Sequence, residues 1–250
     1  MNDYNPFSLQ GKTILITGAS SGIGRETAIQ CSKMGATVVL TGRNEQRLQE
    51  TLSELYNKDN HTLLVADMTT EDGLSSIVNS IHHLDGLVLC AGKGLTLPLQ
   101  FSTREKFNEI FEINFFAPVE LLRVLYKKKK LNKESSVVFV SSIGGTHITR
   151  PGNGIYGASK SAFNSIMKFS AREFAPRKIR VNSVCPGMVA TPFIQRGTLT
   201  DEEFKQDMEL YPLKRYGVPT DIALGIIYLL SDASSWMTGQ SLVIDGGLTM

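Results

Sequence analysis

The sequence lacks the features that mark several specialised classes of protein. Its 250 residues contain one tryptophan, four histidines and only three cysteines, Cys31, Cys90 and Cys185. The cysteines lie far apart and form no Cys-x-x-Cys pair, so we interpret them as buried, reduced side chains rather than as disulfides or zinc ligands. The histidines and carboxylates show no metal-ligand spacing such as His-Glu-x-x-His. We therefore expect no bound metal.

A strong charge of either sign and a long apolar run are also missing. The 26 lysines and arginines nearly balance the 24 acidic residues, and the net charge is +2. This balance argues against a nucleic-acid-binding surface, and we interpret the one basic run, residues 127–130, as a solvated face. No apolar run approaches the ~18 residues that a membrane helix needs, and residues 1–12 lack a signal-peptide pattern. We expect a cytoplasmic protein with neither a membrane nor a nucleic acid as partner.

The chain contains instead a regular alternation of apolar, β-branched runs with helical stretches. This alternation is typical of a parallel sheet with helices on both faces. The predicted strands are 12–17, 36–41, 61–66, 85–92, 137–142, 179–184 and 240–245. The predicted helices are 25–34, one ending near 57, 71–83, 107–116 and 119–126, which are broken or bent near Pro118, 155–175, and one that begins with Thr220 as its N-cap. We find no linker or repeat, and we predict a single α/β domain over 1–250, a doubly wound parallel sheet of about seven strands.

A glycine-rich loop, Gly18-Ala19-Ser20-Ser21-Gly22-Ile23-Gly24, joins the first predicted strand to the first helix. Such a loop lets the backbone approach a pyrophosphate at a helix N-terminus; a purely structural turn is the alternative. The second strand ends at Thr41-Gly42-Arg43, with no acidic residue. An arginine at this place suits the 2′-phosphate of NADP, whereas a carboxylate would suit the ribose of NAD. The pattern favours NADP(H) and leaves NAD(H) open, because Arg43 is also explained as a surface residue at a helix start.

The most informative stretch is the apolar run that ends in two serines at 141–142 and is followed by Tyr156 and Lys160. Four residues make about one helical turn, so Tyr156 and Lys160 share one face of a helix. A phenol ionises near pH ~10, and an ammonium fixed nearby is expected to lower that pKa into a range useful for acid–base catalysis. Ser142, at the strand end, is placed to hold a carbonyl or alcohol oxygen beside the phenol.

Other segments carry weaker signals. Tyr126 and Lys130 repeat the Tyr-x-x-x-Lys spacing without a hydroxyl-ended strand before them, and we interpret them as a solvated helix end. Asn114 lies in an apolar stretch, where its amide either makes a structural hydrogen bond or serves the site. Residues 191–217 follow no strand–helix rhythm and are predicted to form a substrate lid. The helix at 155–175 is apolar on two faces, which predicts a homo-oligomer, either a dimer or a tetramer.

Taken together, these motifs resemble the short-chain dehydrogenase/reductase family over nearly the whole chain. The glycine loop is similar to that family's cofactor loop, and the catalytic tetrad of the family is matched by Asn114, Ser142, Tyr156 and Lys160. The resemblance implies a Rossmann-type fold and an enzyme that transfers a hydride between a nicotinamide cofactor and a carbonyl or secondary alcohol. It implies that Tyr156 exchanges the proton while Ser142 holds the oxygen. Lys160 would bind the nicotinamide ribose, and Asn114 would retain a water that links Lys160 to solvent.

The cofactor is expected to lie along one edge of the sheet, with Asp67 and Met68 beside the adenine and Val189 and Thr191 at the carboxamide. The residues expected to bind it are Gly18, Ser20, Ser21, Gly22, Ile23, Gly24, Arg43, Asp67, Met68, Cys90, Ala91, Gly92, Tyr156, Lys160, Pro186, Gly187, Val189 and Thr191.

The sequence departs from the family pattern at three places. Cys90 stands where the family has asparagine, which puts the local bracing between strands in doubt. The interval between Ser142 and the tyrosine is one residue longer than the commonest spacing, so Ser141 remains an alternative. Arg43 has no basic neighbour at Ser21, which is why the choice between NADP(H) and NAD(H) stays open.

The sequence indicates the substrate less clearly than it indicates the reaction. Residues 211–222, Tyr-Pro-Leu-Lys-Arg-Tyr-Gly-Val-Pro-Thr-Asp-Ile, resemble the equivalent segment of many bacterial 3-oxoacyl-[acyl-carrier-protein] reductases. This suggests a 3-oxoacyl chain on an acyl carrier protein, with Lys133 and Arg177 as basic residues for an acidic carrier. Sugar, steroid and small-alcohol dehydrogenases of the family share the same motifs, and a catalytically silent nucleotide-sensing scaffold is a further alternative.

Substrate specificity is expected to depend on residues 144–155 and on the predicted lid. Within them His147, Arg150 and Phe193 either line the pocket or lie on the surface.

Overall fold

The structure is a computed structural model that describes residues 4–192 and 200–250. Across these residues seven parallel strands form one sheet in the order β3-β2-β1-β4-β5-β6-β7. The strands are β1 Thr13–Thr17, β2 Thr37–Gly42, β3 Thr62–Val65, β4 Leu84–Leu89, β5 Leu131–Val140, β6 Arg180–Pro186 and β7 Ser241–Ile244. The strand order reverses between β1 and β4, and ligands bind at such a reversal in doubly wound sheets. The predicted sheet is therefore confirmed.

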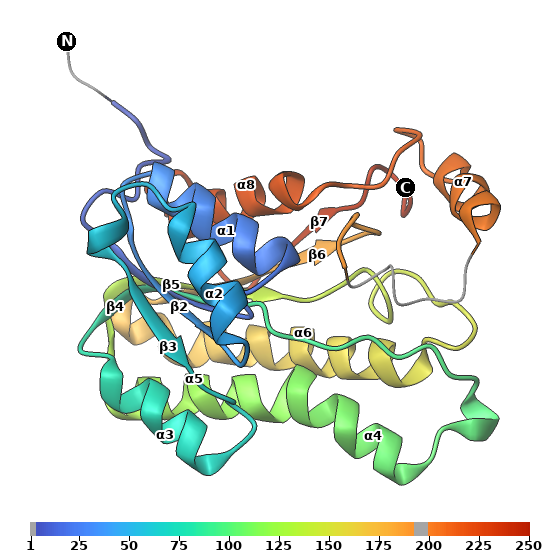
Figure 1. Ribbon diagram of the computed structural model, residues 1–250, viewed down its shortest axis with the longest axis horizontal. Helices are drawn as coiled ribbons and strands as arrows, with labels where there is room; N and C mark the ends of the chain where they lie inside the picture. Colours follow the sequence, from blue (N-terminus) through green and yellow to red (C-terminus); the bar gives the residue numbers. More distant parts are fainter. Residues whose placement is uncertain (1–3, 193–199) are drawn as a thin grey trace.

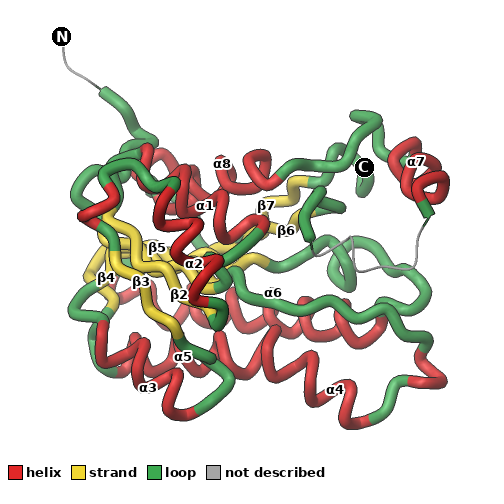
Figure 2. The backbone as a smooth tube through the Cα atoms, in the orientation of Figure 1, coloured by secondary structure: helices red, strands yellow, loops and turns green. Residues whose placement is uncertain are grey.

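Helices cover both faces of the sheet, as Figures 1 and 2 show. One layer consists of α1 Gly22–Lys33, α2 Glu45–Ser53 and α8 Pro219–Leu230, and the other of α3 Glu71–Ser80, α4 Arg104–Phe111, α5 Ala117–Lys127 and α6 Gly154–Phe174. Successive strand residues alternate between the layers: Ile14 and Ile16 belong to the core under α1 and α8, and Leu15 to the core under α5 and α6. No helix in the described part of the chain is both long enough and apolar enough to cross a bilayer.

Strand β5 begins at Leu131, earlier than the predicted 137, because its first half is polar and gives no apolar signal. Leu131 pairs with Leu84, but the next pair is Ser136 with Gly86, so the register shifts between them. The strand then ends at Val140, which leaves the two serines just beyond the sheet. The end of β5 therefore places Ser141 and Ser142 at the start of the loop that leads to Tyr156.

The predicted lid contains a helix that the sequence reading missed, α7 Asp201–Glu209. Its residues are mainly charged, so no apolar periodicity marks it. Its signal is a capping box, in which the backbone N–H of Glu203 donates to the Thr200 hydroxyl while the Glu203 carboxylate accepts from the Thr200 N–H. Phe193 lies outside the described residues.

Two predicted helix boundaries are wrong. The bend near Pro118 is a π turn, Glu112–Phe116, that joins α4 to α5 without a break. The proline sits in the first turn of α5, and a proline has no N–H to donate, so the wider turn before it accommodates that loss. Helix α8 has Val218 rather than Thr220 as its N-cap, and the Asp221 carboxylate accepts from the Val218 N–H at 2.8 Å.

Tyr126 and Lys130 do not form a solvated helix end, which corrects the prediction made for them. The Tyr126 ring stacks on Phe174, with centroids 3.7 Å apart and planes 6° apart. The Lys130 amine donates to the Ile81 carbonyl at 2.5 Å. The carboxyl end of α6 covers this part of α5, so only residues 127–129 of the basic run are exposed as predicted.

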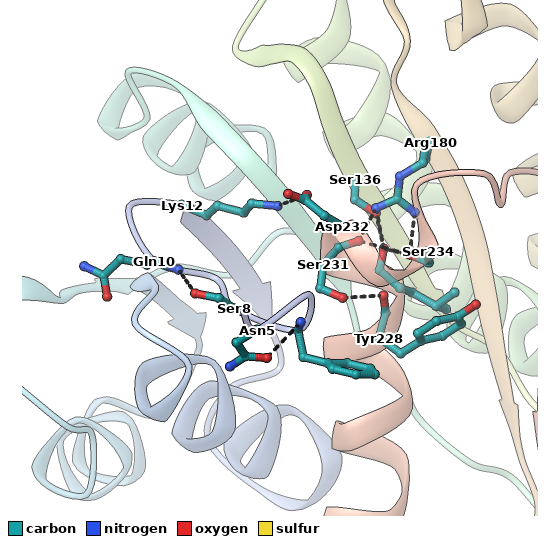
Figure 3. Close-up of polar contacts among 12 residues, drawn as sticks. Asn5, Ser8, Gln10, Lys12, Ser136, Arg180, Tyr228, Ser231, Asp232 and Ser234 are labelled. Carbon is teal, nitrogen blue, oxygen red and sulfur yellow. Dashed lines mark hydrogen bonds and ion pairs between the residues drawn. The ribbon is translucent and has the colours of Figure 1, made fainter. Parts of the chain in front are cut away.

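At the amino-terminal edge of the sheet, Arg180 binds the end of α8 (Figure 3). Its guanidinium donates to the carbonyls of Leu229 (2.8 Å) and Ser231 (3.1 Å) and to the Ser234 hydroxyl (2.8 Å). The last carbonyls of a helix have no partner within the helix, and a cation suits their negative dipole end. Arg180 therefore joins β6 to α8 at the edge opposite the predicted site.

We expect Arg180→Met to lower the free energy of unfolding by roughly 2–4 kcal/mol, because several acceptors lose a charged donor. Urea unfolding followed by circular dichroism measures the change. Arg123→Met is the matched control, since Arg123 forms an exposed pair with Glu120 and should contribute less than about 1 kcal/mol. Equal losses in the two variants would contradict this role for Arg180.

Candidate active site

The structure brings the predicted site residues to one edge of the sheet, where the strands end. Because all strands are parallel, the loops that follow β1 to β6 meet at this edge. The loop after β5 leads into α6, which carries Tyr156 and Lys160 in its first two turns. In Figure 1 the loops after β5 and β6 lie on the same side of the sheet as α7.

The glycine loop between β1 and α1 is packed so closely that side chains are excluded. A Cβ atom on Gly24 would lie 2.3 Å from the Gly18 carbonyl oxygen, and one on Gly18, where φ is +68°, would lie 2.9 Å from Ala91 Cα. The N-cap of α1 is Ser21, and its side chain makes no capping hydrogen bond. The Ser21 side chain therefore leaves the first N–H groups of α1 uncapped, and this arrangement fits the pyrophosphate of a dinucleotide.

Arg43 and Asp67, which follow β2 and β3, contact each other. Arg43 Nη1 lies 3.6 Å from Asp67 Oδ2, although the arginine side chain is 69% exposed. The other Asp67 oxygen accepts from the backbone N–H (3.0 Å) and the hydroxyl (2.7 Å) of Thr69. Burial raises the pKa of Asp67, but these hydrogen bonds and the Arg43 charge outweigh it and lower the pKa below its usual range. Arg43 is thus an exposed cation next to the position expected for the adenosine, with the buried Met68 beside it.

The end of β4 is braced by Thr17, which precedes the glycine loop and is not among the predicted site residues. Its hydroxyl accepts from the backbone N–H groups of Cys90 (3.0 Å) and Ala91 (3.1 Å) and donates to the Val88 carbonyl (3.3 Å). This bracing does not depend on the side chain at position 90, which removes the doubt raised by the missing asparagine. The Cys90 thiol is half-buried, and burial raises its pKa to about 12.

Ser142 and Tyr156 lie together across the loop that joins β5 to α6. Ser142 makes a hydrogen bond with the Tyr156 side chain, and its oxygen accepts from the Gly144 N–H at 3.0 Å. Ser141 is buried and donates instead to the backbone carbonyl of Lys160 at 3.1 Å. The geometry therefore favours Ser142 over Ser141 as the serine of the site.

Lys160 is buried beside the phenol. Its side chain is only 4% exposed, its amine donates to the Val140 carbonyl at 2.9 Å, and it lies 6.0 Å from the centre of the Tyr156 ring. A lysine has three N–H donors, so the contact with Val140 fixes the amine without using all of them. A Cβ atom on Gly92 would lie 3.4 Å from this amine and 3.2 Å from Asn114 Oδ1. The glycine thus leaves room for two polar groups that converge on it.

Asn114 lies in the π turn and makes structural hydrogen bonds to residues outside it. Its amide oxygen accepts from the Lys93 N–H (2.7 Å), and its nitrogen donates to the Lys93 carbonyl (3.0 Å) and to the Ser159 hydroxyl (3.0 Å). The structural alternative raised for Asn114 is therefore present, and it ties the loop after β4 to α6 near Lys160.

The predicted lowering of the Tyr156 pKa is not found in the folded chain, because burial outweighs it. Burial raises the pKa of Tyr156 to about 12, although the hydrogen bond with Ser142 opposes this rise. Burial also lowers the pKa of Lys160 to about 8. The phenol is therefore a proton donor at neutral pH in the folded chain.

The segment after β6, residues 187–191, lies at the same edge of the sheet, beyond the end of β6. The Gly187 N–H donates to the Ile244 carbonyl (3.0 Å), which extends the pairing with β7 beyond Pro186. Val189 is buried, and the methyl group of Thr191 lies 3.2 Å from the point where a Cβ on Gly22 would be. The segment predicted to meet the nicotinamide therefore lies next to the glycine loop.

The two candidate pocket residues in the loop after Ser142 behave differently. His147 is exposed, and its Nδ1 lies 2.8 Å from the Thr146 hydroxyl. Arg150 is half-buried and pairs with Asp207 of α7, with Nη1 and Oδ1 2.7 Å apart. No pattern in the sequence indicated Asp207, because its partner is distant along the chain.

Lys133 and Arg177 lie at the far end of the fold from Tyr156. Lys133 is in the first half of β5, and Arg177 follows the carboxyl end of α6, where it donates to the Leu131 carbonyl. From Tyr156 to that end the helix rises roughly 27 Å at about 1.5 Å per residue. An acyl carrier bound there would not lie beside the phenol of the same chain, and the role of these two residues in receiving an acidic carrier stays a prediction.

Comparisons with known proteins identify relatives that span nearly the whole chain. A family model described as enoyl-(acyl carrier protein) reductase matches residues 18–249. The chain is similar to the 3-oxoacyl-[acyl-carrier-protein] reductase FabG of Rickettsia bellii, at 37% identity over 97% of this chain and 98% of the relative. It is also similar to a tropinone reductase homolog of Arabidopsis thaliana, at 33% identity over 100% of this chain and 94% of the relative. A solved dehydrogenase/reductase of Sinorhizobium meliloti 1021 superimposes with a TM-score of 0.87 at 31% identity, covering 98% of each chain.

Burial of Lys160 should reduce stability at neutral pH. Its pKa falls from the ordinary 10.5 to about 8, so between these values the folded chain binds fewer protons than the unfolded chain, and stability rises with pH. We expect Lys160→Met to be more stable than the parent at pH 7 by roughly 1–2 kcal/mol, and the difference to shrink by pH 9.5. Urea unfolding at both pH values measures it.

Lys168→Met, at an exposed position of the same helix, is the control and should leave the pH dependence unchanged. A Lys160→Met variant whose stability parallels that of the parent at both pH values would show that the lysine is not destabilised by burial.

Proposed function

Because the chain belongs to the short-chain dehydrogenase/reductase family, we propose that it is an enzyme that uses NADPH to reduce a carbonyl group to a secondary alcohol. One observation carries the proposal: the Tyr156 phenol contacts Ser142 at the end of β5, beside the buried amine of Lys160. A proton donor, an oxygen-binding hydroxyl and a cation thus occupy one place at the edge where a dinucleotide binds in this fold.

Tyr156 supplies the proton in the proposed reaction. Its phenol is protonated at neutral pH, so it donates to a carbonyl oxygen placed beside it, while the Ser142 hydroxyl donates a hydrogen bond to the same oxygen. Reduced nicotinamide, when bound, supplies the hydride to the carbonyl carbon. The protonated Lys160 stabilises the phenolate left on Tyr156 until solvent returns the proton.

The dinucleotide would lie along the edge described above. The uncapped start of α1 would hold the pyrophosphate, Lys160 the nicotinamide ribose, and Val189 with Thr191 the carboxamide. Arg43 is the cation at the adenosine end, and its side chain is exposed enough to meet a 2′-phosphate. This placement supports NADPH over NADH, although Asp67 competes for the same guanidinium.

A 3-oxoacyl thioester on an acyl carrier protein is the substrate class that we propose. Its support is the likeness to FabG of Rickettsia bellii over nearly the whole of both chains. A tropinone reductase homolog matches over a similar length, so acetoacetyl thioesters should be assayed beside sugar, steroid and small-alcohol substrates. Turnover of one of these with none of the thioesters would refute the acyl proposal and leave carbonyl reduction intact.

We also propose that the chain self-associates through α6. The face of α6 toward the sheet is buried at Phe163 and Met167, whereas Phe169, on the other apolar face, is 62% exposed. A helix that is apolar on two sides needs a second surface to cover it, and another copy of the chain supplies a matching one.

Tyr156→Phe separates an enzyme from a silent scaffold. We expect kcat for NADPH-dependent reduction of an acetoacetyl thioester to fall by at least about 100-fold, because the general acid is lost. Binding of NADPH, followed by its fluorescence, should persist. Tyr126→Phe repeats the change in the other Tyr-x-x-x-Lys copy, keeps the stacked ring and should leave turnover unchanged. A Tyr156→Phe protein with normal turnover would refute the proposed mechanism.

Arg43→Gln tests the choice of cofactor. We expect KM for NADPH to rise by roughly tenfold or more, the effect of losing a charged hydrogen bond, while KM for NADH stays the same. Arg47→Gln, an exposed arginine on α2, serves as the control. An equal change for both cofactors would mean that Arg43 does not read the 2′-phosphate.

A further inference from the structure

Arg150 is connected through its backbone to the helix that carries the proposed general acid. Its carbonyl accepts from the Asn153 N–H at 3.1 Å, and the Asn153 carbonyl accepts from the Gly157 N–H at 2.7 Å. A further bond, from the Leu97 N–H to the Gly152 carbonyl at 2.7 Å, ties this loop to the one after β4. Arg150 therefore belongs to a braced segment that ends at Tyr156.

The Arg150 side chain reaches α7, where Asp207 uses both of its oxygens. Oδ1 accepts from Arg150 Nη1 at 2.7 Å, and Oδ2 accepts from the Tyr216 hydroxyl at 2.8 Å. The arginine side chain is 32% exposed and the carboxylate only 13%. This pair is shielded from water, whereas the ion pair between Lys214 and Glu209 is 59% and 72% exposed.

Tyr216 connects the same carboxylate to the segment after β6. Its ring packs edge-to-face on Tyr211, with centroids 5.4 Å apart, and the Tyr211 hydroxyl accepts from the Met188 N–H at 3.2 Å. Asp207 thus joins α7 to both segments that flank the proposed substrate position: the loop before Tyr156 and the strand end before Val189. No other charged pair that the structure describes joins α7 to the loop between β5 and α6.

We propose that the Arg150–Asp207 pair sets the position of α7 over the substrate side of the site, and so determines affinity for the carbonyl substrate without changing the chemical step. Removing either partner leaves the other charge shielded and unpaired, which weakens the attachment of α7 to the loop before Tyr156. Because the pair contacts none of the residues assigned to the dinucleotide, NADPH binding is unaffected. The kinetic part of this inference rests on the proposed reductase function, and the structural part does not.

Amide hydrogen exchange of the whole protein tests the structural part. In Arg150→Gln the amides of α7 should exchange about tenfold faster than in the parent, and the charge-swapped double variant Arg150→Asp with Asp207→Arg should return them toward the parental rate. Lys214→Gln removes the exposed pair at the end of the same helix and should leave exchange unchanged. Exchange in Arg150→Gln that equals the parent, or a Lys214→Gln effect of the same size, overturns the proposal.

Steady-state kinetics with an acetoacetyl thioester test the rest. Arg150→Gln should raise KM for the thioester about tenfold, with KM for NADPH and kcat within twofold of the parent, and the charge-swapped variant should recover most of the loss. A fall in kcat with unchanged KM, or an equal rise in KM for NADPH, overturns the positioning role. If the parent reduces no carbonyl substrate, the proposed function fails, whereas the exchange experiment still decides whether the pair holds α7.

Discussion

The buried amine of Lys160, held by the carbonyl of Val140, is the contact on which the arrangement of the site depends. It fixes α6 against the end of β5 from one side, while the Ser141 hydroxyl binds the Lys160 carbonyl from the other. With the helix held at this depth, the residue one turn earlier, Tyr156, lies beside Ser142. Burying a cation opposes folding, and the packing of α6 residues such as Phe163 against the sheet offsets that cost.

The remainder of the edge is shaped by close backbone approaches. Gly18 and Gly24 leave no room for side chains, and Thr17 replaces a side-chain brace from β4 with hydrogen bonds to the backbone. The segment after β6 lies at the same edge, with Thr191 next to the glycine loop. Steric exclusion and a few hydroxyl contacts, rather than charge, therefore give this edge its shape.

Local patterns were enough to predict the strands, the glycine loop and the shared face of Tyr156 and Lys160, because each depends on residues close in sequence. The same patterns did not indicate α7, whose charged helix has no apolar period. They also wrongly predicted a solvated position for Tyr126, because its ring is covered by Phe174 from a helix that is distant in sequence.

Electrostatics was the property least accessible from sequence. Spacing placed an ammonium near the Tyr156 phenol but could not reveal how deeply both groups are buried, and burial reverses the expected direction of the phenol's pKa. In the same way, Lys133 and Arg177 carry suitable charges, yet only the sheet order shows that they lie at the opposite edge.

The π turn at Glu112–Phe116 has a consequence for how this helix tolerates change in length. A π turn holds one residue more than an α turn, and one residue of an α-helix corresponds to about 100° of rotation. Shortening the chain by one residue here would allow a regular helix and would swing Asn114 away from Lys93. A one-residue deletion in this turn should therefore keep the helix continuous but break the hydrogen bonds between Asn114 and Lys93. The continuity of the helix and the attachment of the loop after β4 thus depend on different features of the same turn.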